Sequence, residues 1–350
     1  MNNDLSSYFE DPEFKEALEK YEGMVKNHTP AYFDADELTD IAEYYASKGR
    51  QIEAEAAIDF ALQLHPNDTD ALIFRARSLA MKGRLDEAYM VMDLIEDRSD
   101  REVRFLKADL LMEEKRMEEA DHVFEELAAY EEGKLETLID IILAYIDANQ
   151  EALAKKWIKH VGETYDLASL SQKSQKFRDL LCDFYITFNN PEAAIPLLQA
   201  TLDCYPYSIN HWNSLGKCYL STNDYEEAHE AIDFALAIDD SNAEALTLKA
   251  FCYQQSGELQ KSCDYYLRLA EQQENKTRAY LALAKTYFEM QDYTSSIYYI
   301  EALLDNKDAL SKYELSELYG DIALCHAALK HIGVGQASIR RSLELNENDP

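Results

Sequence analysis

Few residues of this sequence are spaced for chemistry. The only local group of cysteine and histidine consists of Cys325, His326 and His331. Metal ligands on one helix must lie three, four or seven residues apart, and these three lie one, five and six apart. Adjacent glutamates occur at Glu113-Glu114, Glu118-Glu119 and Glu131-Glu132. They lack the cleft that acid–base catalysis requires, so we interpret them as solvated charge.

Motifs that build other reaction centres are absent from the sequence. It has no H-E-x-x-H metal motif, no G-x-x-x-x-G-K-[ST] phosphate loop, no G-x-G-x-x-G nucleotide turn and no G-x-S-x-G nucleophile turn. None of the six cysteines forms a C-x-x-C pair. We therefore predict no enzymatic activity, no catalytic residue, no cofactor and no metal site.

The elements that carry these residues follow a repeat of thirty-four residues. The clearest copy begins at Ile209. It places Trp212, Leu215, Gly216, Tyr219, Ala228, Ile232 and Ala235 at relative positions 4, 7, 8, 11, 20, 24 and 27. This spacing resembles that of the tetratricopeptide repeat (TPR) family. The resemblance implies one helix–turn–helix pair per repeat, and pairs that must stack because none can bury its apolar face alone.

The expected fold is all-α: a right-handed TPR superhelix, or α-solenoid, of about nine repeats plus an N-terminal capping helix. Residues 1–34 hold the cap, because Ala17, Tyr21 and Met24 are spaced as in a second helix. Residues 35–349 hold the array. Its repeats lie near 35–68, 69–102, 101–134, 135–168, 175–208, 209–242, 243–276, 277–310 and 316–349.

Several repeat positions have a predictable physical role. Positions 8, 20 and 27 are small so that two helices can approach closely. Gly49, Gly83 and Gly257 stand at position 15, where a positive φ would end the first helix. Extra residues at 169–174 and near 310–316 break the period. Each is expected to lengthen the following first helix, either as a tolerated insertion or as a local change of pitch that shapes a binding surface.

The charge balance restricts the partners. With 34 basic and 67 acidic residues the net charge is −33. This field repels nucleic acid and anionic membranes, and it favours either simple solubility or a basic partner. No run of apolar residues approaches a membrane span of about 20 residues, and the N-terminus does not resemble a secretory signal. We expect a cytoplasmic protein that binds neither nucleic acid nor membrane.

The family resemblance implies a non-catalytic scaffold that binds a peptide or protein segment in a concave groove. In that family the first helices line the groove, chiefly through positions 2, 5, 9, 12 and 13. One candidate groove is basic and would bind an acidic segment: Asn213, Lys217, Phe251, Arg278, Leu281 and Lys285. The alternative is acidic and would bind a basic segment: Asp36, Glu43, Asp70, Glu102 and Asp109. A third interpretation is that Lys217 and Lys285 only pair with acidic neighbours.

Two other kinds of function stay open at this point. The chain could be an architectural subunit that assembles a complex, or a homodimer through its terminal helix, using its ends or its convex face. Ile339, Leu343 and Leu345 favour this, because no helix follows to cover them. The chain could also be the regulatory part of a longer protein with a domain after residue 350.

Overall fold

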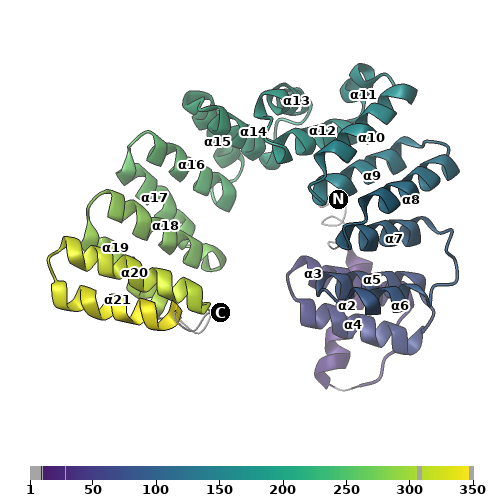
Figure 1. Ribbon diagram of the computed structural model, residues 1–350, viewed down its shortest axis with the longest axis horizontal. Coiled ribbons are helices and arrows are strands. Elements are labelled where there is room, and N and C mark those ends of the chain that lie inside the picture. Colours follow the sequence, from purple (N-terminus) through teal and green to yellow (C-terminus); the bar gives the residue numbers. More distant parts are fainter. Residues whose placement is uncertain (1–8, 10, 28, 306–309, 347–350) are drawn as a thin grey trace. The chain divides into compact units, whose positions relative to one another are not determined.

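The structure is a computed structural model that describes residues 9, 11–27, 29–305 and 310–346. Every regular element in these ranges is a helix, which confirms the all-α fold class (Figure 1). The chain forms two compact units, Met1–Thr164 and Tyr165–Pro350, which we call unit 1 and unit 2.

Unit 1 is a row of antiparallel helix pairs preceded by one further helix. Its helices are α2 (Pro12–Asn27), α3 (Ala35–Ser47), α4 (Gln51–Leu64), α5 (Thr69–Met81), α6 (Leu85–Met92), α7 (Arg101–Glu113), α8 (Met117–Tyr130), α9 (Leu135–Asp147) and α10 (Glu151–Thr164). Helix α2 packs on α3 through Phe14, Ala17 and Tyr21, all of which are buried. Met24 lies at the edge of the same core.

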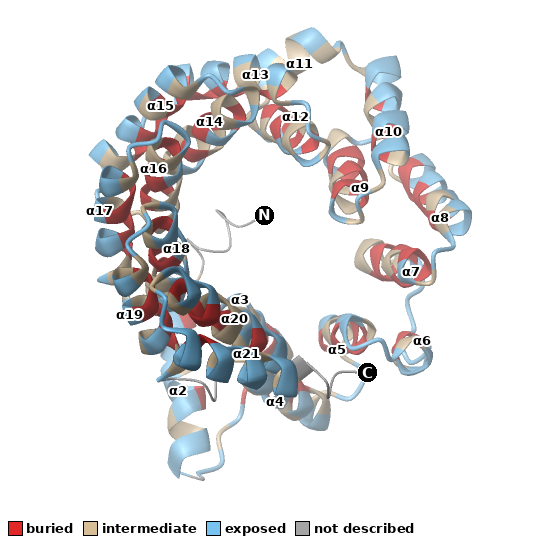
Figure 2. Cartoon of the chain, turned by 60° about the vertical axis from the view of Figure 1, so that its left-hand side comes forward, coloured by how far each residue is buried: buried red, intermediate tan, exposed pale blue. Residues whose placement is uncertain are grey.

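Unit 2 continues the same pattern of pairs. Its helices are α11 (Leu167–Lys173), α12 (Gln175–Thr187), α13 (Pro191–Cys204), α14 (Ile209–Thr222), α15 (Tyr225–Ile238), α16 (Ala243–Gln255), α17 (Leu259–Ala270), the 3₁₀ turn η1 (Gln273–Asn275), α18 (Lys276–Glu289), α19 (Tyr293–Leu304), α20 (Lys312–Ala328) and α21 (Ile332–Asn346). Within each unit, buried residues lie on the sides of helices that face their neighbours (Figure 2).

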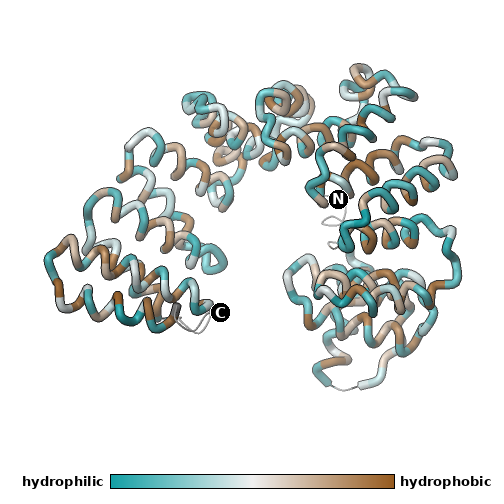
Figure 3. Tube along the Cα trace, in the orientation of Figure 1, coloured by the Kyte–Doolittle hydropathy of each residue, from teal (hydrophilic) through white to brown (hydrophobic). Residues whose placement is uncertain are grey.

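One small residue recurs wherever two helices of a pair pack. The residue at position 20 of each repeat is buried: Ala54, Ala88, Ala120 and Ala154 in unit 1, and Ala194, Ala228, Ser262, Ser296 and Gly335 in unit 2. Hydrophobic and hydrophilic stretches accordingly alternate along the helices (Figure 3). This alternation leaves one side of each helix for packing and the other for solvent.

Gly216 shows how close the approach is. A Cβ atom built at this position of α14 would lie 2.7 Å from Cγ1 of Ile232 on α15. Ile232 is itself completely buried, so it has little room to move. Gly320, in the interior of α20, differs, because a Cβ there would approach only Ser342 Oγ, at 3.9 Å. There is therefore no room for a Cβ atom at Gly216, whereas there is room for one at Gly320.

We predict opposite effects of alanine at these two glycines. Gly216→Ala should destabilise the protein by about 1–3 kcal/mol, since the added methyl overpacks a filled contact. Gly320→Ala should stabilise it by about 0.5–1 kcal/mol, since alanine is the better helix former and finds room. Urea unfolding followed by circular dichroism measures both. Equal effects of the two substitutions would contradict the close approach at Gly216.

The turn between the two helices of each pair has one fixed conformation. At position 15 every repeat has a residue with positive φ, between 54° and 78°. Gly49, Gly83 and Gly257 are among them, as their conformational freedom predicts. The other repeats place Lys115, Asn149, Asn189, Asn223, Gln291 and Lys330 there. Asparagine tolerates this region, whereas lysine and glutamine adopt it at a cost of about 1–2 kcal/mol.

The two insertions behave differently from each other. The prediction for residues 310–316 is confirmed: α20 has 17 residues and begins with a capping box formed by Ser311 and Glu314. The prediction for residues 169–174 is wrong. These residues end a separate helix, α11, and Ser174 caps a following helix, α12, of ordinary length.

A buried arginine explains why α11 is separate. Arg178 of α12 is only 5% exposed, and its Nη1 donates to the carbonyl oxygens of Ser171 (2.9 Å) and Gln172 (3.1 Å). Its Nε donates to Thr201 Oγ1 on α13 at 3.0 Å. The guanidinium thus satisfies carbonyls at the C-terminal end of α11, where a positive charge is favourable.

Candidate protein-binding surfaces

In unit 1 the first helices of the pairs, α3, α5, α7 and α9, present a polar surface that we call the first-helix surface. All five residues of the predicted acidic groove lie on these helices. Asp36 and Glu43 are on α3, Asp70 is on α5, and Glu102 and Asp109 are on α7. Contacts join α3 to α5 and α5 to α7, so the carboxylates form one row within the unit.

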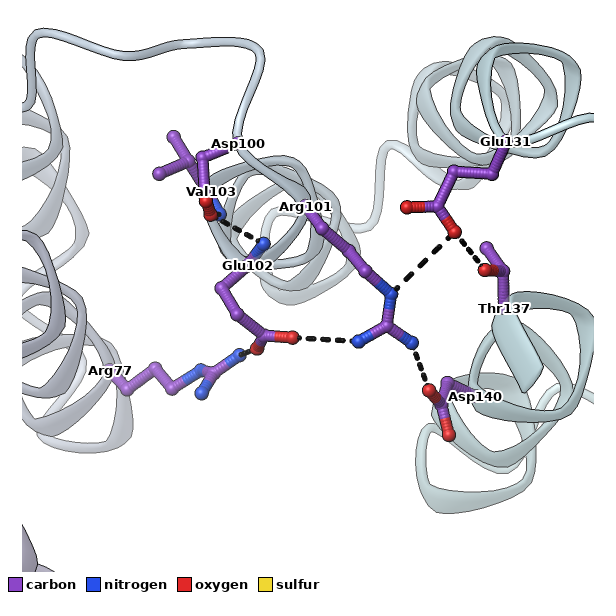
Figure 4. A network of polar contacts seen from close by, with 8 residues as sticks. All are labelled: Arg77, Asp100, Arg101, Glu102, Val103, Glu131, Thr137 and Asp140. Carbon is purple, nitrogen blue, oxygen red and sulfur yellow. Dashed lines mark hydrogen bonds and ion pairs between the residues drawn. The ribbon is translucent and has the colours of Figure 1, made fainter. Parts of the chain in front are cut away.

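Two arginines cross this row and tie its helices together (Figure 4). Arg77 of α5 lies 3.5 Å from Glu102 and 3.6 Å from Asp109. Arg101 of α7 pairs with Glu102 at 3.0 Å, with Asp140 of α9, and at 3.9 Å with Glu131, which directly follows α8. Each guanidinium therefore forms ion pairs with more than one carboxylate. The side chains remain 32–45% exposed at Arg77, Arg101, Glu102 and Asp140, so each pair contributes little to stability.

The carboxylates of the first-helix surface repel one another. Partial burial raises the pKa of Glu43, and the nearby Asp40, Asp70 and Glu102 raise it further, against the opposing effect of Arg77. Burial also raises the pKa of Asp70, with Asp68, Asp36, Asp100 and Glu102 adding to the effect.

The pKa values of two further carboxylates, farther along the row, are also raised. The pKa of Asp109 is raised by burial and by Glu102 and Asp147, against the opposing effect of Arg77. Burial likewise raises the pKa of Asp140 although Arg101 opposes it. A cation placed here would be stabilised by several carboxylates at once.

The predicted basic groove lies in unit 2, and its residues are less available. Asn213 is only 1% exposed, and its Nδ2 donates to Asn242 Oδ1 and to Glu244 Oε2, both at 3.1 Å. Lys217 forms an ion pair with the same Glu244. Two of the six residues, Asn213 and Lys217, are therefore already bonded to residues at the start of the neighbouring helix α16.

The remaining four residues are exposed on their helices. Phe251 of α16 and Leu281 of α18 are 41% and 36% exposed. Arg278 and Lys285 of α18 are also exposed, and Lys285 lies close enough to Asp321 to act on its pKa. This surface is thus more apolar and less basic than the sequence predicted.

The sequence prediction missed three charged residues of the first-helix surface, Asp40, Asp140 and Arg101. Asp40 and Asp140 stand at position 6, outside the positions used to predict the groove, and Arg101 stands at position 1. A charge count along the whole exposed side of each first helix, instead of selected positions, would have found them.

The outer side of the last described helix, α21, is apolar and uncovered within the described residues. Ile332, Val334, Ile339 and Leu343 are 50–68% exposed. Ile300, at the equivalent position of α19, is 1% exposed because α20 covers it. A homodimer through this helix stays a prediction.

Comparisons with known proteins agree with the repeat geometry. The family model described as tetratricopeptide repeat matches residues 39–89 and 213–277. The chain therefore contains tetratricopeptide repeats. A similar crystal structure is the C-terminal part of a TPR repeat-containing protein from Cytophaga hutchinsonii, with 18% identity and a TM-score of 0.53. The likeness covers 70% of this chain and 96% of that one, which confirms the TPR fold.

One curated relative is the formate-dependent nitrite reductase complex subunit NrfG of Escherichia coli O157:H7. It is 26% identical over 191 residues, which span 53% of this chain and 89% of the relative. TPR repeats mediate interactions between proteins and typically have no catalytic activity of their own. None of the described helices of this TPR protein is long and apolar enough to cross a membrane.

Proposed function

We propose that this TPR protein is a non-catalytic scaffold whose first-helix surface in unit 1 binds a basic segment of a partner protein. The row of carboxylates on the contacting helices α3, α5 and α7 carries the proposal. Burial, together with neighbouring carboxylates, raises the pKa values of Glu43, Asp70 and Asp109 in this row. A chain that gathers ionised groups at a cost in stability gains most when a cation binds there. The relative NrfG is a subunit of a complex, which supports a role in assembly.

The acidic surface is preferred to the basic groove of unit 2 for a structural reason. Glu244 already neutralises Lys217 and accepts a hydrogen bond from Asn213. An acidic segment would have to displace that carboxylate before it could bind either residue. Asp36, Glu43 and Asp70, in contrast, are exposed and form no ion pair within 4 Å among the described residues.

The binding test removes three charges without disturbing the two arginines. The variant Asp36→Asn, Glu43→Gln, Asp70→Asn keeps the ion pairs of Arg77 and Arg101. Each lost contact with a cation is worth about 0.2–1 kcal/mol, so affinity should fall roughly three- to hundredfold. The probe is a fluorescent ten-residue peptide of alternating arginine and serine, followed by anisotropy at low ionic strength.

A matched control separates this surface from general attraction by the acidic chain. The variant Asp86→Asn, Glu96→Gln, Glu118→Gln removes the same charge from exposed residues elsewhere in unit 1. It should bind the peptide almost as the parent does. Equal losses in the two variants would overturn the proposed surface. Binding of an acidic peptide that is lost on Lys217→Glu, Lys285→Glu would instead establish the basic groove.

Binding should also depend on pH in a direction set by the raised pKa values. At pH 7 the carboxylates are ionised and attract the peptide, whose arginines do not titrate. As the pH falls, Glu43, Asp70 and Asp109 gain protons before ordinary carboxyls do, whose pKa is about 4. On acidification from pH 7, affinity should therefore begin to decline at a higher pH than ordinary carboxyls would cause, measured by anisotropy. The triple variant should show a shallower decline, and an equally steep one would contradict this mechanism.

A further inference from the structure

Unit 2 contains a second candidate site, away from the first-helix positions. Helices α13, α14 and α15 line an open pocket with a volume of about 490 Å³. We call it the Trp212 pocket and define it by Trp212, Tyr219, Phe234, Asp203, Glu227 and Glu230. Its residues on α14 stand at positions 4, 7 and 11, whereas Asn213 and Lys217 stand at positions 5 and 9.

Aromatic rings form the floor of the pocket and are held in place. The rings of Trp212 and Phe234 stack with centroids 4.5 Å apart and planes inclined by 18°. The indole Nε1 of Trp212 donates to the carbonyl oxygen of Pro206 at 2.8 Å. At the side of the pocket, Gln199 Nε2 donates to the hydroxyl of Tyr219 at 2.8 Å. The site is therefore organised before any ligand arrives.

Carboxylates surround these rings without cations to balance them. Asp203, Glu227 and Glu230 are exposed, and none forms an ion pair within 4 Å in the part of the chain that the structure describes. Phe234 is 54% exposed although it is a large apolar side chain. The pocket thus combines open aromatic faces with unbalanced negative charge.

In the next repeat, lysine and arginine side chains lie over aromatic rings. Lys249 and Lys261 lie 5.6 and 5.1 Å from the ring centroid of Tyr253. Arg268 lies 5.5 Å from that of Tyr265. Arg268 stands at position 26, which is the position of Phe234 in the preceding repeat. Among the described residues, no lysine or arginine lies over Trp212 or Phe234 in this way.

We propose that the Trp212 pocket binds an arginine side chain of a partner protein. A planar guanidinium stacks on aromatic faces and donates paired hydrogen bonds to carboxylates, so it matches both features of the pocket. Its aliphatic stem would lie against Leu202, Leu215 and Ala231. This site is independent of the proposed function of unit 1, because the two share no residue.

The test uses the two tryptophans of the chain as reporters. In protein labelled with ¹⁵N-tryptophan, the indole signal of Trp212 is followed while N-acetyl-arginine amide is added. The signal of Trp157, buried in unit 1 and bonded to Asp121, serves as the internal reference. We expect a saturable shift of Trp212 alone, with a Kd on the order of 1–10 mM, as for a single weakly held side chain. N-acetyl-citrulline amide, which lacks the charge, should bind at least tenfold more weakly.

Substitutions in the Trp212 pocket show which side chains contribute to arginine binding. Glu227→Gln with Glu230→Gln should weaken arginine binding at least threefold, and so should Phe234→Leu. Glu226→Gln, a neighbouring exposed residue of α15 outside the pocket, should leave it unchanged. A shift that does not saturate, that citrulline reproduces, or that survives loss of both glutamates overturns the proposal. Tighter binding of tetramethylammonium than of the arginine amide overturns the assignment to arginine.

Discussion

The contact between the two helices of each pair depends on a residue with almost no side chain. At position 20 the chain places alanine, serine or glycine, and each is buried. Where position 8 is glycine as well, as at Gly216, the helices approach so closely that a single methyl would overlap Ile232. The larger residues around this point then fill the remaining space and define the register. The exposed surfaces are free to vary because the contacts between the paired helices do not involve them.

That division of roles explains why the candidate sites lie on exposed helix sides. In unit 1 the carboxylates of α3, α5 and α7 repel one another, while Arg77 and Arg101 compensate only part of that repulsion. Such an arrangement lowers the stability of the isolated chain. A scaffold of packed helix pairs can tolerate this cost, since the burial at its helix contacts is large and each pair contacts only its neighbours.

The fold could be predicted from the sequence because its determinants are local and periodic. The spacing of small and large residues located the helix pairs, and the glycines at position 15 located three turns. Six other turns have the same positive φ without glycine, at residues such as Lys115 and Gln291. Three of these six residues are asparagine, which tolerates that conformation, but nothing in lysine or glutamine indicates it. It follows from the geometry that the packed pair imposes, which overrides the local preference.

The candidate sites were harder to predict, because their properties depend on neighbours from other repeats. Lys217 is basic in sequence but neutralised by Glu244, which lies twenty-seven residues away in the chain. No repeat position distinguishes Arg178 in the sequence, yet it is buried and bonds to Ser171 and Gln172 at the end of the separate helix α11. Periodicity describes what the repeats share, whereas these contacts arise where one repeat differs from the next.

The net charge of −33 is not spread evenly, because the positions of the basic side chains decide which carboxylates are left unpaired. With 34 basic and 67 acidic residues, the chain cannot balance every carboxylate. Several arginines and lysines cross between helices, as Arg101 does, or cover aromatic rings, as Arg268 does. Charges separated by more than about 8–10 Å are largely screened at physiological salt, so a distant cation does not compensate. Attraction for a partner is therefore concentrated where carboxylates lack a nearby cation, and the row on α3 and α5 and the rim of the Trp212 pocket are two such places.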